Sequence, residues 1–325
     1  MTVKTANKAE KSSWRGASNE ERCRWMDELV IVHPKFKKGI DTLSEKIEYA
    51  QKTGRGAGVF LMGAAGSGKS TFIKYLENLH GELPDPLPLD KTLCPVVKFK
   101  IPKVCNQKQL MVEILRAMQD LIPDKGNYTE LKIRVVKLFS ECKVRLVLVD
   151  DLQDVPALRK NKGIQEIASC FRDLIDQTSA VFLMCGTEAA QVVIDGEVQL
   201  RRRVPCRLFL RYFDIKEDAQ KPDFVRLMHE LEKRIPLAEK SCITDPAVME
   251  RMFLATNGML QYLIELIDLA WPIATKADRE HIVAEDLALA FGKLWGDVSY
   301  TNNPFDMTKK PRELTKEGEP FYDWK

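Results

Sequence analysis

The chain has 325 residues, of which 45% are hydrophobic and 30% are charged, and its formal net charge is +3 at pH 7. These values describe an ordinary globular protein of one large or two smaller domains, and they exclude nucleic-acid binding through overall positive charge alone. Because the N-terminus is polar and no apolar run reaches about eighteen residues, we expect no signal peptide and no membrane span.

The cysteines are eight in number and scattered, and no two form a C-x-x-C pair. This spacing argues against a zinc site and against a disulfide framework. We therefore expect free thiols and a cytoplasmic protein.

The N-terminal region divides into an arm and two helices. Residues 1–17 hold several basic side chains and a single acid, which predicts a disordered basic arm, either merely solvated or in contact with nucleic acid. Ser18 and Glu21 form a capping box that opens a helix lasting until His33. A second helix is predicted from about residue 35 to 52 by its helical spacing of apolar residues, so that the helical region covers 18–53.

The next segment reads Gly-Ala-Ala-Gly-Ser-Gly-Lys-Ser from residue 63, which is the phosphate-loop pattern G-x-x-x-x-G-K-[ST]. It follows an apolar strand and opens a helix predicted over 69–80. The loop N–H groups and the helix N-terminus would bind the β-phosphate, Lys69 would reach the β- and γ-phosphates, and the Ser70 hydroxyl would ligate Mg²⁺. The predicted nucleotide-binding residues are Gly63, Ala65, Gly66, Ser67, Gly68, Lys69, Ser70 and Thr71.

Beyond the loop, a strand is predicted over 95–102, an amphipathic helix over 109–121, and a further helix that Thr129 can cap. Two local basic clusters lie in this region, and each is either a solvated face or a binding site. Their members are Lys98, Lys100, Lys103 and Lys108, and Lys132, Arg134 and Lys137.

A second chemical motif is the apolar strand from residue 144 that ends in Asp150 and Asp151. Doubly wound sheets place metal-binding acids at the carboxyl ends of their strands. After a phosphate loop, Asp150 is predicted to hold the Mg²⁺ shell through water, and Asp151 to position or deprotonate the attacking water.

Two further features complete the nucleotide-binding region. A helix over 163–177 and a strand over 180–185 lead to Thr187, which is either a γ-phosphate sensor or a simple helix N-cap. Three arginines, 201–203, then precede a strand over 207–210. We expect them to be hard to pack within one subunit and suited to the γ-phosphate of a neighbour, because the guanidinium fork matches phosphate geometry.

The C-terminal third is helical and then irregular. An all-helical domain over 216–297 is predicted to have helices at 217–235, 245–255, 260–269 and 284–295, with breaks at Asn257-Gly258 and Pro272. Residues 298–325 lose periodicity but carry prolines and aromatic side chains. This tail is either a docking segment for a partner or a segment that folds back on its own domain.

Taken in this order, the phosphate loop, the strand with two acids, the strand ending in Gly-Thr, the arginines and the helical domain resemble the AAA+ ATPases over about residues 35–297. Within that superfamily the chain looks most like the TniB/TnsC-type transposition regulators. The segments behind this narrower resemblance are the N-terminal helices, 184–190, 199–203 and 256–258. The resemblance implies an α/β core over 54–215, with a parallel sheet flanked by helices, and a helical lid over 216–297.

The resemblance also implies a function. It predicts an ATP-dependent homo-oligomer, a ring or helical filament on double-stranded DNA, that links a TniQ-type target-selection protein to the transposase subunits. ATP would lie between subunits, so Arg202 or Arg203 would be the trans-acting finger, and the sequence does not choose between them. The family's contacts to the DNA backbone point to Lys103, Thr129 and Lys132, and the tail would contact transposase proteins.

Two residues depart from the AAA+ pattern. Asp151 stands where a glutamate is usual, and its carboxylate is one methylene shorter, which predicts slow, Mg²⁺-dependent hydrolysis suited to a timed switch. Gln261 stands where the lid pattern Gly-x-x-Arg has its arginine, so lid closure on the γ-phosphate is weaker or another residue supplies the charge. A replication initiator or helicase loader, and a signalling NTPase that controls protein assembly without DNA, are the alternatives.

Overall fold

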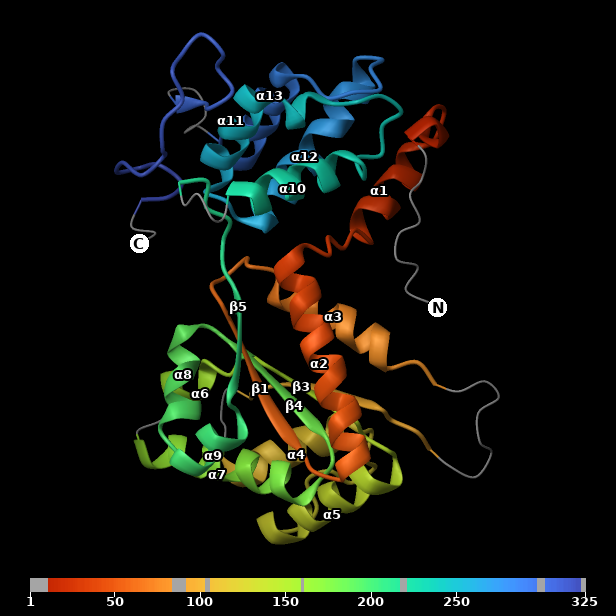
Figure 1. Cartoon of the computed structure of the whole chain (residues 1–325), viewed down its shortest axis with the longest axis vertical. Helices are drawn as coiled ribbons and strands as arrows, with labels where there is room; N and C mark the ends of the chain where they lie inside the picture. Colours follow the sequence, from red (N-terminus) through yellow and green to blue (C-terminus); the bar gives the residue numbers. More distant parts are fainter. Residues whose placement is uncertain are drawn as a thin grey trace. The chain divides into compact units, whose positions relative to one another are not determined.

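The computed structural model describes residues 11–83, 92–102, 106–158, 161–216, 221–296 and 302–322. The chain divides into two compact units (Figure 1). Among the described residues, unit 1 covers 35–211, and unit 2 combines 11–34 with those from Tyr212 onward. The predicted boundary at residue 53/54 therefore differs from this division, because the two N-terminal helices belong to different units.

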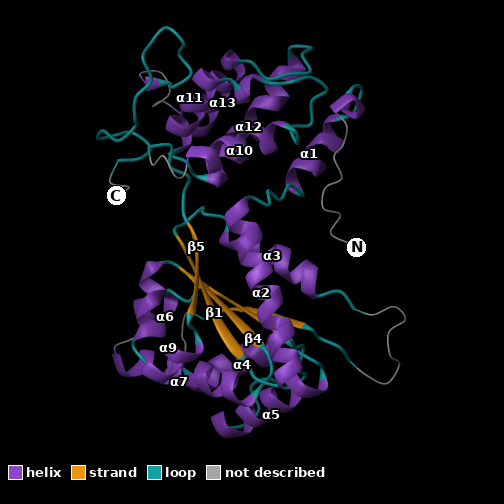
Figure 2. Ribbon diagram, viewed as in Figure 1, coloured by secondary structure: helices purple, strands orange, loops and turns teal. Residues whose placement is uncertain are grey.

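The centre of unit 1 is a five-stranded parallel sheet (Figure 2). Its order is β2-β3-β4-β1-β5. The strands are β1 (Ala57–Gly63), β2 (Val96–Lys100), β3 (Leu146–Asp150), β4 (Val181–Gly186) and β5 (Cys206–Leu210). The central strands β3 and β4 are buried along their whole length, as expected for a parallel sheet covered on both faces.

The helices of unit 1 bury apolar stripes against this sheet. Strand residues such as Phe60 and Phe182 share a core with α4, α5 and α7, while Phe36 of α2 and Phe72 of α3 pack edge to face at 4.8 Å. The helices are α2 (Pro34–Thr53), α3 (Lys69–His80), α4 (Gln107–Ala117), α5 (Tyr128–Glu141), α6 (Asp154–Leu158), α7 (Asn161–Gln177), the 3-10 turn η2 (Glu188–Ala190), α8 (Gln191–Asp195) and α9 (Val198–Arg203). The predicted α/β fold with a parallel sheet flanked by helices is confirmed.

Unit 2 is all helical and has its own core around the buried Trp271. Its elements are η1 (Lys11–Trp14), α1 (Asn19–Asp27), α10 (Lys221–Glu232), η3 (Cys242–Thr244), α11 (Pro246–Thr256), α12 (Leu260–Lys276) and α13 (Ala284–Trp295). No helix among the described residues of either unit is long and apolar enough to cross a membrane.

Four local predictions were wrong. Of the predicted disordered arm, residues 11–17 are ordered, because Lys11 and Arg15 form ion pairs with Glu232 and Glu239, and residues 1–10 lie outside the described residues. Helix α1 ends at Asp27 rather than near His33. Asn127, not Thr129, caps α5, because its side chain and that of Glu130 complete a capping box. Pro272 does not break α12, which continues to Lys276.

The described part of the C-terminal tail folds back on unit 2. Phe305, Leu314 and Phe321 are buried in the core of that unit. Arg251 of α11 is 7% exposed and donates hydrogen bonds to the backbone carbonyls of Pro304, Asp306 and Lys309. Of the two alternatives for the tail, residues 302–322 therefore follow the second.

Candidate nucleotide site and arginine helix

The phosphate loop joins β1 to α3, as the motif requires. Gly66 and Gly68 have φ angles of 70° and 93°, a left-handed conformation that glycine adopts without strain. Gly68 occupies the N-cap position of α3, so the loop meets the positive end of that helix. Backbone N–H groups in such a loop form an anion-binding concavity, and the geometry therefore fits a nucleotide phosphate.

Close packing at the base of the loop also requires glycine. A Cβ atom on Gly63 would lie 2.3 Å from the Ser67 Oγ atom and 2.8 Å from the carbonyl oxygen of Leu210. The Ser67 hydroxyl is buried and has no hydrogen-bond partner among the described residues. Ala65 and Ser70 are exposed, and Ser70 and Thr71 lie in the first turn of α3.

Lys69 lies on the loop itself. Its ammonium donates hydrogen bonds of 2.7 Å to the carbonyl oxygens of Gly63 and Ala64. Burial lowers the pKa of Lys69, and the negative charge of Asp150 opposes this shift. The lysine and the acid at the end of β3 thus act on one another at the carboxyl edge of the sheet.

Asp150 is the last residue of β3 and is 5% exposed. Burial raises the pKa of its carboxyl group, and the neighbouring charge of Asp151 raises it further. No group of three His, Cys, Asp or Glu residues among those described could hold a metal ion alone. Mg²⁺ commonly takes one or two protein ligands together with substrate phosphates, so Ser70 and Asp150 fit such an ion.

Both carboxylate oxygens of Asp151 are held by neighbours that the sequence analysis did not assign to the site. Lys100 binds the Oδ2 atom at 3.0 Å, and Gln153 donates to the Oδ1 atom at 3.0 Å. Asp151 itself has a φ angle of 59°, and its N–H donates to the Oδ1 atom of Asp150. The β2–β3 register, which pairs Lys100 with Asp150, brings this lysine to the site.

Gln153 also connects Asp151 to the end of β4. Its Oε1 atom accepts a hydrogen bond of 3.2 Å from the backbone N–H of Thr187. Thr187 precedes η2, but its hydroxyl does not cap that turn. Thr187 therefore occupies the N-cap position of η2 without a capping hydrogen bond from its hydroxyl, and its role as a phosphate sensor stays a prediction.

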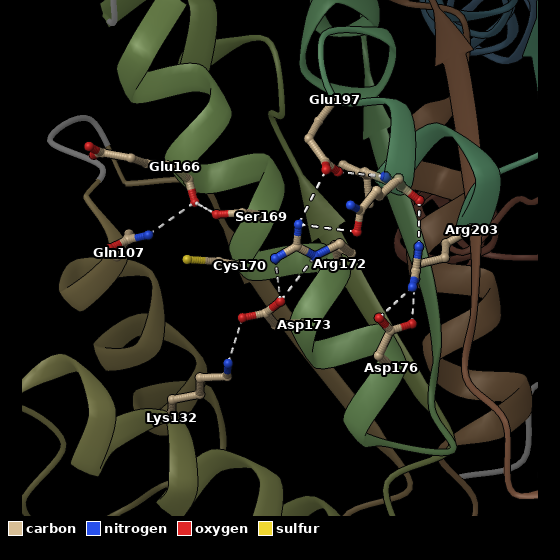
Figure 3. Close-up of polar contacts among 12 residues, drawn as sticks. Gln107, Lys132, Glu166, Ser169, Cys170, Arg172, Asp173, Asp176, Glu197 and Arg203 are labelled. Carbon is tan, nitrogen blue, oxygen red and sulfur yellow. Dashed lines mark hydrogen bonds and ion pairs between the residues drawn. The ribbon is translucent and has the colours of Figure 1, made fainter.

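The three arginines lie in the last turn of the six-residue helix α9. Arg203 forms a bidentate pair with Asp176 of α7, with its Nη2 atom 2.6 Å from Oδ2, and also donates to the carbonyl of Gln199 (Figure 3). The expectation that all three are hard to pack within one subunit was therefore wrong for Arg203. Arg201 and Arg202 are exposed; the charge of Arg201 acts on Asp195, whereas the side chain of Arg202 has no hydrogen bond or ion pair to any described residue.

The predicted DNA contacts have different outcomes. Lys103 lies outside the described residues. Thr129 is exposed in the first turn of α5. Lys132 is 18% exposed, and its ammonium lies 2.6 Å from a carboxylate oxygen of Asp173 (Figure 3). To bind Lys132, a DNA phosphate would have to displace the Asp173 carboxylate from its ammonium. At Thr129 a phosphate would displace no described side chain.

In unit 2, the segment from Gly258 to Gln261, where the AAA+ lid pattern Gly-x-x-Arg would end in arginine, connects α11 to α12. Gly258 has a φ angle of 68°. Gln261 is exposed and donates to Glu265 one turn later in α12. Gln261 therefore brings no positive charge to this surface.

Comparison with known families gives one match. The model of the family described as bacterial TniB protein matches residues 22–211, which include the phosphate loop, both acids and the arginine helix. No curated protein matches the chain.

Solved structures with the same fold are more distant in sequence. The Aeropyrum pernix ORC2 protein, solved as ADPNP-ADP complexes, has a TM-score of 0.56 at 15% identity, with 83% of this chain and 71% of that chain covered. Cdc6p from Pyrobaculum aerophilum has a TM-score of 0.54 at 16% identity, with 79% and 66% covered. Drosophila ORC bound to DNA has a TM-score of 0.52 at 15% identity, with 88% and 70% covered. At these identities the similarity shows the fold.

Proposed function

The chain belongs to the TniB family and has the fold of AAA+ ATPases, and from this premise we propose that it is an ATP-dependent, DNA-binding regulator of transposition. It assembles on duplex DNA with ATP between subunits and links a TniQ-type target-selection protein to the transposase. The observation that carries the proposal is the combination, within the family match, of a phosphate loop, two acids and an exposed arginine that contacts no partner in the described part of the chain.

In this proposal each side chain of the nucleotide site has a defined role. The loop N–H groups and Lys69 bind the phosphates, and Ser70 and Asp150 hold Mg²⁺, which neutralises phosphate charge when bound. Asp151 orients the attacking water, and Thr187 senses the γ-phosphate from the end of β4. Lys100 and Gln153 fix the orientation of the Asp151 carboxylate.

Hydrolysis is slow in this proposal for two reasons. Asp151 has a shorter side chain than the usual glutamate, so its carboxylate stays close to the backbone. Each of its oxygens already accepts a hydrogen bond, one of them from the positively charged Lys100, so the carboxylate attracts the proton of a water less strongly through its remaining lone pairs. A slow rate suits a switch in which ATP marks the assembled state.

Assembly follows from the exposed arginine side chains of α9. A guanidinium binds phosphate through parallel N–H donors and is effectively always charged. Arg202 is exposed and bonds to no described residue, so it is free to bind the γ-phosphate at a neighbouring subunit. DNA contacts from Lys103, Thr129 and Lys132 go to the backbone, which makes affinity salt-dependent and largely independent of sequence.

The test is electron microscopy of the purified protein with duplex DNA in ATP, in a non-hydrolysable analogue and in ADP. Lys69→Ala removes the phosphate contact, and Lys52→Ala, which removes an exposed lysine paired with Glu48 in α2, is the matched control. We expect rings or filaments that need both DNA and triphosphate in the wild type and the control, and none in Lys69→Ala.

Each other outcome selects an alternative. Triphosphate binding without assembly on DNA would contradict the proposal and favour a signalling NTPase. Assembly on DNA that neither binds transposase subunits nor responds to a target-selection protein would favour a replication initiator or loader. Pull-down of labelled transposase by the DNA-bound assembly separates these cases.

A further inference from the structure

Helix α9 is too short to fix its own direction. It has six residues, and isolated helices shorter than about 12 residues are marginal in water. The direction in which its arginines point is therefore set by contacts from outside the helix. These contacts come from α7 and from β1.

The N-terminal end of α9 is tied to α7 through Arg172. The N-cap residue Glu197 accepts a 2.5 Å hydrogen bond from the N–H of Leu200 with one carboxylate oxygen. Its other oxygen accepts from Arg172 at 3.3 Å, and Arg172 also binds Asp173 at 2.8 Å (Figure 3). The cap of α9 is thus part of an ion-pair chain anchored on α7.

The C-terminal end of α9 is tied to α7 one turn further along, at Asp176. This carboxylate binds two nitrogens of Arg203, the fork geometry that makes arginine–carboxylate pairs strong. The next residue, Val204, is fully buried, and a Cβ atom on Gly58 of β1 would lie only 2.5 Å from the Val204 Cγ2 atom. The end of α9 is therefore fixed relative to the strand that leads into the phosphate loop.

We propose that Asp176 and Arg172 are positioning residues for α9, that Arg203 is its anchor, and that Arg202 is the arginine presented to the neighbouring subunit. This inference rests on the proposed function, because it assumes a nucleotide shared between subunits. Arg203 has its fork occupied within its own subunit, whereas Arg202 is exposed and has no partner among the described residues. The sequence alone left these two arginines equivalent.

The test is a double-mutant cycle on DNA-stimulated ATP hydrolysis with Asp176→Ala, Arg203→Ala and the double variant. If Arg203 acts only through Asp176, each single change lowers kcat by the same factor, about ten- to a hundredfold, and the double variant is no slower. Binding of a fluorescent ATP analogue by the same subunits stays at the wild-type value. The control is Glu141→Ala, which removes an exposed carboxylate paired with Lys137.

Two further measurements separate positioning from misfolding. Amide hydrogen exchange of residues 198–203 should rise in Asp176→Ala while exchange in β1 and β3 stays unchanged. Arg202→Ala should abolish hydrolysis without altering exchange, and mixing it with Lys69→Ala subunits should restore activity, since each supplies what the other lacks.

The outcomes also distinguish this inference from the proposed function. If the wild-type rate per subunit does not depend on protein concentration and Arg202→Ala hydrolyses normally, the shared site is wrong, and the inference falls with it. If the shared site is supported but Arg203→Ala is several-fold slower than Asp176→Ala, Arg203 itself contacts the nucleotide and only the inference is overturned.

Discussion

Replacing Gly258 with alanine should destabilise unit 2 more than any ordinary Gly→Ala change. Gly258 has a φ angle of 68°, and a Cβ atom there would lie 1.9 Å from the carbonyl oxygen of Phe213 and 2.9 Å from its carbonyl carbon. The N–H of Phe213 donates to the carbonyl of Gly258 at 3.0 Å, which holds the two segments together. The clash is with backbone, so a rotamer change cannot relieve it.

A matched control separates the two sources of destabilisation. Gly318, also in unit 2, has a φ angle of 80° but no atom within 4 Å of the Cβ position. Gly318→Ala should therefore cost about 1–2 kcal/mol, for the left-handed conformation alone. Gly258→Ala adds overpacking of about 1–3 kcal/mol, for a total of about 2–5 kcal/mol.

Urea unfolding followed by tryptophan fluorescence measures this difference, because Trp14, Trp25, Trp271 and Trp295, the tryptophans that the structure describes, all belong to unit 2. We expect the free energy of unfolding to fall in both variants, and by at least about 1 kcal/mol more in Gly258→Ala. Equal losses in the two variants would refute the steric argument and leave only backbone conformation as the cause.

Three other predictions test the site and unit 2. ATP with Mg²⁺ at about a hundred times its Kd should stabilise the wild type by about 2.7 kcal/mol in calorimetry and leave Lys69→Ala unchanged; equal stabilisation would contradict the assigned phosphate contact. Arg251→Ala should expose residues 302–322 to rapid proteolysis, since three carbonyls lose their donor, whereas Arg226→Ala on the exposed face of α10 should not. Burial raises the pKa of Glu280, but hydrogen bonds from Arg22 and from the Ala238 N–H outweigh it and hold the pKa below 4.5. The stabilisation from ionised Glu280 is therefore fully present above pH 4.5 and is lost as the pH falls through the lowered pKa. In an acid titration, the free energy of unfolding of Glu280→Gln should fall less steeply than that of the wild type. Identical curves would exclude Glu280 as a source of this pH dependence.

The features that the sequence predicted are those that local patterns determine. Helix α3 covers residues 69–80 as predicted, and α13 covers 284–295, because each has a helical apolar spacing and a defined start. The parallel sheet was implied by the resemblance to the AAA+ ATPases, and apolar strands that alternate with helices are typical of it. The phosphate loop and Asp150 were placed correctly next to their strands for the same reason.

The features that the sequence did not predict depend on which elements become neighbours. Lys100 was grouped with basic surface residues, and only the β2–β3 register places it against Asp151. Gln153 carries no motif, and its role depends on the adjacent ends of β3 and β4. Arg203 was grouped with Arg202, because the pairing with Asp176 depends on how α7 packs against α9.

The contacts around Asp151 and those around helix α9 act in the same way. Asp151 has a strained left-handed φ angle and is held by Lys100 and Gln153, so its carboxylate has one fixed direction. Helix α9 is held at both ends by α7, so the backbone that carries Arg202 also has a fixed position. In each case the proposed functional element takes its position from neighbouring side chains, so we expect a substitution at Gln153 or Asp176 to change the rate of hydrolysis without changing nucleotide affinity.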